Sequence, residues 1–109
     1  MNTGFGSMIL HKLIHQYLNI GYIDVHVYYN YIEILFYRGL TRNDLSETHC
    51  LKFMAFLRKY GVPQFYSEKK TVSGNKHDAE FYWKCTIKDI TPEELAGLIR
   101  LTRGGKDAN

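Results

Sequence analysis

Residues 22–37 read YIDVHVYYNYIEILFY, and they decide the fold because apolar residues recur along them with a period of two. A strand places successive side chains on opposite faces, so each half of this stretch has one apolar face. A single hairpin register then joins six apolar residues as three cross-strand pairs: Ile23 with Phe36, Val25 with Ile34 and Val27 with Ile32. The stretch therefore predicts an antiparallel hairpin that buries one face.

The opposite face of this predicted hairpin is unusually aromatic. The same register pairs Tyr22 with Tyr37, Asp24 with Leu35, His26 with Glu33 and Tyr28 with Tyr31. The connection at Tyr29 and Asn30 fits a two-residue primed turn poorly, because such a turn needs positive φ at both positions and tyrosine disfavours it. A longer loop of the same parity is the alternative.

Helical patterns flank the hairpin on both sides. The first predicted helix starts near Ser7, after a flexible lead over residues 1–6, and ends at Gly21. The second starts within residues 41–47, which contain several N-cap candidates, among them Asp44 with Glu47 three residues later, and it runs to Tyr60. Its inward stripe includes Cys50, Phe53 and Leu57, and Gly61 and Pro63 end it.

The C-terminal half repeats the order of hairpin and helix. A polar strand from Phe65 to about Val72, a turn at residues 73–75 and an alternating strand over residues 79–88 predict a second hairpin. Thr91, Pro92 and Glu94 form a capping-box pattern that starts a third helix. The apolar residues expected to face the core from this helix are Leu95, Leu98, Ile99 and Leu101. The helix is expected to end at residues 104–105 and to leave a frayed tail over 106–109.

Together these elements predict one α+β domain over residues 1–109, in the order α-β-β-α-β-β-α. The expected architecture is a four-stranded, mainly antiparallel sheet with helices packed on one face. A chain of 109 residues and 12.8 kDa is long enough to bury an ordinary hydrophobic core. The other face of the sheet is expected to be at least partly open.

Charge and composition exclude several classes of protein. The formal net charge of +3 is too weak to establish a nucleic-acid partner, and it excludes an acidic mimic of DNA. No stretch has the roughly 20 apolar residues that a membrane span needs, so no membrane partner is expected. Two cysteines without short spacing, and a start without the pattern of a signal peptide, predict a cytoplasmic location.

The residue types that carry chemistry do not form a convincing site. His11 and His15 lie four residues apart on a helix, but a third metal ligand and the glutamate of a zinc motif are absent from the pattern, which predicts a solvated face and no metal. Cys50 and Cys85 both fall on apolar faces and are expected to be buried structural residues. No glycine-rich phosphate loop follows a strand. We therefore expect neither an enzyme nor a cofactor.

The tyrosines provide the main functional hypothesis. Nine occur in the chain, and tyrosine is enriched at interfaces because it joins a large rigid surface to a hydroxyl group. The predicted partner-binding face comprises Tyr22, His26, Tyr28, Tyr31, Glu33 and Tyr37. Its partner would be another protein or a second copy of the chain. A short chain of this composition is also compatible with accessory proteins of phages and mobile elements that inhibit a host factor by binding it.

Nucleic-acid binding is the alternative hypothesis. Residues 58–88 contain seven Lys and Arg against three Asp and Glu. Base stacking beside phosphate contacts is compatible with the alternating strand. The residues of this alternative site are Lys69, Lys70, Tyr82, Lys84 and Lys88.

Overall fold

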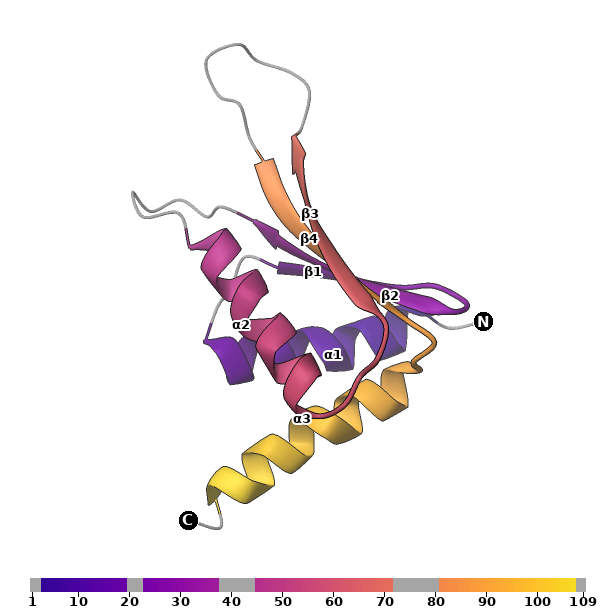
Figure 1. Ribbon diagram of the computed structural model, residues 1–109. Coiled ribbons are helices and arrows are strands. Elements are labelled where there is room, and N and C mark those ends of the chain that lie inside the picture. The colour runs from indigo at the N-terminus through magenta and orange to yellow at the C-terminus, as the bar shows by residue number, and fades with distance from the viewer. Residues whose placement is uncertain (1–2, 20–22, 38–44, 72–80, 108–109) are drawn as a thin grey trace.

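The predicted order of elements is confirmed by a computed structural model, which describes residues 3–19, 23–37, 45–71 and 81–107. The elements are α1 (Thr3–Leu18), β1 (Ile23–Val27), β2 (Tyr31–Tyr37), α2 (Ser46–Lys59), β3 (Phe65–Thr71), β4 (Phe81–Lys88) and α3 (Pro92–Asp107). Figure 1 shows the three helices on one side of the sheet. The chain is a single α+β domain.

The four strands form one antiparallel sheet in the order β1-β2-β4-β3. The predicted register of the first hairpin is confirmed: Ile23 pairs with Phe36, Val25 with Ile34 and Val27 with Ile32. Neither Tyr29 nor Asn30 has a positive φ among the described residues, so the connection is not the primed turn. The backbone N–H of Tyr28 donates to the Tyr31 carbonyl at 2.9 Å and closes the loop.

The hydrophobic core lies between the sheet and the helices. The central strands supply residues that are almost fully buried, among them Ile34, Phe36 and Ile87. The helices supply a buried residue set on the other side of the core: Leu10 and Ile14 from α1, Phe53 and Leu57 from α2, and Leu95 and Ile99 from α3. Burial of such side chains is the main favourable term in folding.

The helix ends differ from the sequence-based expectation in three places. Helix α1 begins at Thr3 rather than near Ser7, because its first turns pack closely on the start of α3: a Cβ on Gly6 would lie 3.3 Å from that of Pro92. Helix α3 continues past residues 104–105 to Asp107, since glycine lowers helix stability by about 1 kcal/mol but permits helical dihedrals. Leu101 is exposed rather than inward.

The start of α2 also differs. Leu45 occupies the N-cap position without a capping side-chain hydrogen bond. The predicted cap, Asp44, lies outside the described residues, as do the predicted turn at residues 73–75, residues 79–80 at the start of the last predicted strand, and the last two residues of the predicted tail.

Two predicted helix ends are confirmed. The N–H of Thr91 donates to the Glu94 carboxylate at 2.9 Å, and the N–H of Glu94 donates to the Thr91 hydroxyl at 3.1 Å, which is a reciprocal capping box. After α2, Gly61 has a φ of 77°, and the N–H of Val62 donates to the Leu57 carbonyl at 3.0 Å. This is the Schellman arrangement, in which glycine adopts the left-handed conformation without a steric penalty.

Two glycine substitutions should therefore change stability in opposite directions. Gly61→Ala should lower the free energy of unfolding by about 1 kcal/mol, because alanine is strained at positive φ. Gly97→Ala, in the middle of α3 with open space at the Cβ position, should raise it by roughly 0.5–1 kcal/mol. Urea denaturation of both variants measures the two changes. If both substitutions changed the free energy of unfolding in the same direction, the backbone conformation assigned to Gly61 or to Gly97 would be wrong.

Candidate functional site

The candidate site is the face of the sheet that the helices do not cover, here called the open face. Its side chains follow from the strand register, in which Glu33 pairs with Thr86 and Thr86 with Tyr66. The members with described side chains, from β1 across to β3, are Asp24, His26, Tyr28, Tyr31, Glu33, Leu35, Tyr37, Tyr82, Lys84, Thr86, Lys88, Tyr66, Glu68 and Lys70. Residues from all four strands thus meet on one surface.

Paired tyrosines lie at both ends of the open face. Tyr28 and Tyr31 stack with ring centroids 4.6 Å apart and an interplanar angle of 16°. At the other end Tyr37 contacts Tyr82 with centroids 5.5 Å apart. The Tyr37 hydroxyl donates to Asp24 Oδ2 at 3.1 Å, and burial together with this hydrogen bond raises the pKa of Tyr37 to about 12. Each of these rings thus lies in contact with a second aromatic ring on the same face.

A charged cluster occupies the middle of the open face. Lys84 Nζ lies 3.3 Å from Glu33 Oε2 and 3.6 Å from Glu68 Oε2. Partial burial by itself lowers the pKa of the Lys84 ammonium, but the hydrogen bonds and charges of the two glutamates more than offset this and hold its pKa above the usual value. Lys70 approaches Glu68 at 3.2 Å and lowers the pKa of that carboxyl group. The cluster therefore neutralises most of its own charge.

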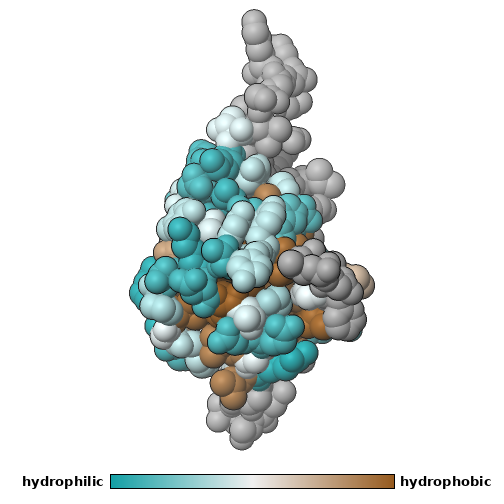
Figure 2. All heavy atoms as spheres, turned by 90° about the vertical axis from the view of Figure 1, so that its right-hand side faces the viewer, coloured by the Kyte–Doolittle hydropathy of each residue, from teal (hydrophilic) through white to brown (hydrophobic). Residues whose placement is uncertain are grey.

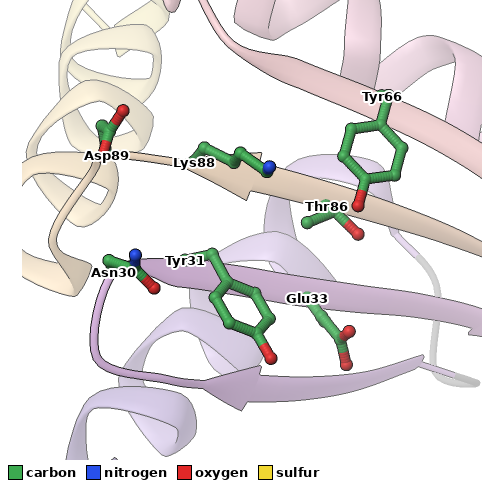
Figure 3. A pocket seen from close by; sticks show the side chains of 7 residues that line it. All are labelled: Asn30, Tyr31, Glu33, Tyr66, Thr86, Lys88 and Asp89. Atoms are coloured by element: carbon green, nitrogen blue, oxygen red, sulfur yellow. The ribbon is translucent and has the colours of Figure 1, made fainter.

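A hollow of about 340 Å³ lies between the charged cluster and the Tyr28–Tyr31 pair. Its lining residues are Asn30, Tyr31, Glu33, Tyr66, Thr86, Lys88 and Asp89 (Figure 3). Thr86 is only 3% exposed, and within the described part of the chain its hydroxyl has no hydrogen-bond partner. Since no helix covers this face, the taller neighbouring side chains bury Thr86.

The structure brings together most residues of the two sites that the sequence suggests. Of the predicted partner-binding face, His26, Tyr28, Tyr31, Glu33 and Tyr37 lie on the open face, and Tyr22 lies outside the described residues. Of the alternative nucleic-acid site, Lys70, Tyr82, Lys84 and Lys88 lie on the same surface. Lys69 pairs with Trp83 and has the parity of the helix-covered face. The pairing of β2 with β4 merges the two predicted sites.

Tyr66, Glu68 and Thr86 were not among the predicted site residues. The alternation of Tyr66, Glu68 and Lys70 along β3 was a usable signal for two of them, because their common parity places them on one face. The alternation along β4 likewise places Thr86 on the same face as Lys84 and Lys88, but nothing local indicates that it is buried. Its burial depends on neighbours in two other strands.

The two cysteines singled out from the sequence are part of the core, and His11 contacts the backbone at the start of β1. Cys50 and Cys85 are fully buried, as predicted, and burial raises the pKa of both thiols, that of Cys50 to about 12. Both thiols are therefore protonated at neutral pH. One ring nitrogen of His11 lies 3.1 Å from the Ile23 carbonyl oxygen. Over the described ranges there is no group of three or more metal-ligating side chains, and no helix is long and apolar enough to cross a bilayer.

The surface is mixed in character rather than broadly apolar on the side that Figure 2 shows. Hydrophilic and weakly polar residues cover most of its described part, with smaller hydrophobic areas between them. Interfaces between proteins that also exist apart are about as apolar as the rest of a protein surface, so this composition does not by itself mark an interface. The comparisons found no matching protein-family model, no matching curated protein and no matching solved structure.

Replacing Asp24 should change the titration of Tyr37. In Asp24→Asn the carboxylate charge is lost, so the pKa of Tyr37 should fall from about 12 toward its ordinary value of 10, with the share due to burial remaining. In the unmodified protein the raised folded-state pKa of Tyr37 contributes stability below pH 10, and this contribution is lost as the pH rises from 10 toward 12. Asp24→Asn should therefore lose less stability than the unmodified protein over that pH interval. The pKa of Tyr37 is measured in both proteins by following the NMR chemical shift of its Cζ carbon as the pH is raised.

Tyr28 provides the internal control for this titration. Burial raises the pKa of Tyr28, with Glu33 and Tyr31 adding to the shift and Asp24 not involved. Its pKa should be the same in both proteins. An unchanged Tyr37 pKa in Asp24→Asn would refute the hydrogen bond.

Removing the Thr86 hydroxyl should stabilise the fold. Thr86→Val keeps the shape of the side chain and eliminates a buried hydroxyl without a described partner, so the free energy of unfolding should rise by about 1 kcal/mol. Thr71→Val, at an exposed position of β3, is the control and should change stability by less than about 0.5 kcal/mol. A destabilised Thr86→Val in urea denaturation would mean that the hydroxyl is hydrogen-bonded.

Proposed function

We propose that this protein is a non-enzymatic interaction module that binds a protein through the open face. The observation that carries the proposal is an uncovered sheet face with a tyrosine pair at each end and a self-neutralising charged cluster between them. Tyrosines held in place lose little conformational entropy when a partner binds. The face thus offers rigid aromatic contacts around hydrogen-bonding groups.

The charge pattern favours protein over nucleic acid as the partner. Phosphate binding needs lysines whose charge is available to the backbone. Lys84 and Lys70 are instead paired with Glu33 and Glu68 at 3.2–3.6 Å. Because Asp24, Glu33 and Glu68 balance Lys70, Lys84 and Lys88, the open face carries about as many negative as positive groups.

Two exposed positions test which side of the protein binds. A photo-crosslinking amino acid replaces Tyr66 on the open face, 46% exposed, or Leu51 on α2, 53% exposed, in cells that produce the chain. We expect protein adducts at position 66 and far fewer at position 51. Adducts with twice the mass of the chain would identify a second copy as the partner. Equal adducts at both positions, or adducts at position 51 alone, would contradict the proposal.

Truncating one tyrosine pair should weaken this association at least tenfold. Tyr28→Ala combined with Tyr31→Ala removes the stacked pair from the open face, so adducts at position 66 should fall accordingly while the thermal midpoint changes little. If the double variant unfolds, Tyr28→Ser alone, at a residue 43% exposed, replaces it. Undiminished adducts in a folded variant, or binding to an oligonucleotide that weakens steeply with salt, would refute protein binding through this pair.

A further inference from the structure

A second surface feature, here called the α3 groove, lies between α3 and the connection from α2 to β3. Its volume is about 610 Å³, and residues 60–63 line it opposite the α3 residues Glu93, Gly97 and Leu101. Figure 1 shows this connection passing beside α3. An added Cβ at Gly61 or Gly97 would have no neighbouring atom within 4 Å, so the described side chains leave the groove open.

One end of the α3 groove is apolar. Val62 is buried, and the half-buried Ile90 and Leu98 pack against the hydrophobic core. Leu101 lies one turn of α3 beyond Leu98 and is 64% exposed. The groove therefore extends the core to the surface as an apolar strip. A partner that covered this strip would gain the free energy of removing it from water.

The other end of the α3 groove is acidic, because Asp89, Glu93 and Glu94 line it. The Glu94 carboxylate accepts a hydrogen bond from the Thr91 N–H at 2.9 Å, and these two residues complete the capping box without Glu93. Among the described side chains, neither Asp89 nor Glu93 has an ion-pair partner. Two carboxylates are thus available to a positively charged group.

The lysines near the α3 groove do not cancel this charge. Lys88 lines the groove, but its ammonium group lies 5.9 Å from the centre of the Tyr66 ring on the open face. Figure 3 shows the Lys88 side chain extending toward Tyr66 and away from Asp89. Lys59 is not a lining residue, and its ammonium group lies 5.8 Å from the centre of the Tyr60 ring. The groove therefore attracts cations and disfavours nucleic acid or anionic lipid.

We propose that the α3 groove binds an apolar segment of a partner protein that carries a lysine or arginine at one end. The eight residues from Glu93 to Leu101 span roughly 12 Å along a helix axis. An extended segment of about four residues covers the same length, so its apolar side chains reach Leu101 while its cation reaches Glu93. This site lies outside the open face, and the inference does not depend on protein binding there.

Four acetylated and amidated tetrapeptides separate the role of charge from that of apolar contact. The probe is Leu-Leu-Ser-Lys, the two charge controls are Leu-Leu-Ser-Gln and Leu-Leu-Ser-Glu, and the polar control is Ser-Ser-Ser-Lys. Each is titrated into the ¹⁵N-labelled full chain at constant ionic strength. We expect saturable amide shifts at Gly97 and Leu101 with the probe, binding of the glutamine peptide weaker by about two- to fivefold, and no saturation with the other two.

Two pairs of matched variants test the groove itself. Leu101→Ser should weaken binding of the probe at least about threefold, whereas Leu51→Ser, at a leucine 53% exposed on α2, should leave it unchanged. Glu93→Gln should weaken it by about two- to fivefold, whereas Glu47→Gln should not. Glu47 is also in the first turn of a helix, so this control removes the general effect of such a glutamate on its helix dipole.

A variant that fills the groove keeps the test independent of folding. Gly97→Leu places a side chain in the open space, so it should abolish binding of the probe without lowering the thermal midpoint. The proposal is overturned by non-saturable shifts with the probe, by equal binding of the glutamate peptide, or by a Gly97→Leu variant that binds like the unmodified protein. It is also overturned if light scattering finds a dimer that Leu101→Ser dissociates, because a second copy would then occupy the groove.

Discussion

The antiparallel pairing of β2 with β4 is the constraint on which the rest of the structure depends. It joins two hairpins that are distant in sequence and makes β2 and β4 the central strands. On one side of this ladder, Ile34 and Cys85 face each other beneath the helices. On the other side, Glu33 meets Thr86 and Tyr37 meets Tyr82. The core and the open face are therefore two consequences of one register, because side chains alternate across a sheet.

That register also determines where the open face is hollowed and which of its side chains are buried. The central strands place the short Thr86 and the aliphatic Leu35 among long side chains, and both are buried although no helix covers them. Lys84 contributes by lying over the sheet with its ammonium group between Glu33 and Glu68. Long amphipathic side chains cover apolar surface in this way while their charge stays paired or hydrated. The hollow thus results from differences in side-chain length in a flat layer.

The sequence predicted the local features and missed those that depend on distant pairing. The register of β1 with β2 was readable because both strands and their turn lie within residues 22–37. The capping box of Thr91 and Glu94 was readable for the same reason. The pairing of β2 with β4 has no local signature, so two separate candidate sites were expected where the fold forms one surface. The early start of α1 was missed because nothing local in residues 1–6 indicates that this segment lies against the start of α3 at Pro92.

The arrangement of charge at the sheet edges favours contacts through the face. β1 has only five residues and includes Asp24 and His26, and β3 carries Glu68, Lys69 and Lys70 in succession. Short or charged edge strands resist pairing with strands of other molecules, since a partner strand would have to tolerate those charges. The tyrosine pairs Tyr28–Tyr31 and Tyr37–Tyr82 lie instead on the open face. Growth of the sheet at its edges is thereby disfavoured, while its aromatic groups remain accessible from the direction perpendicular to the strands.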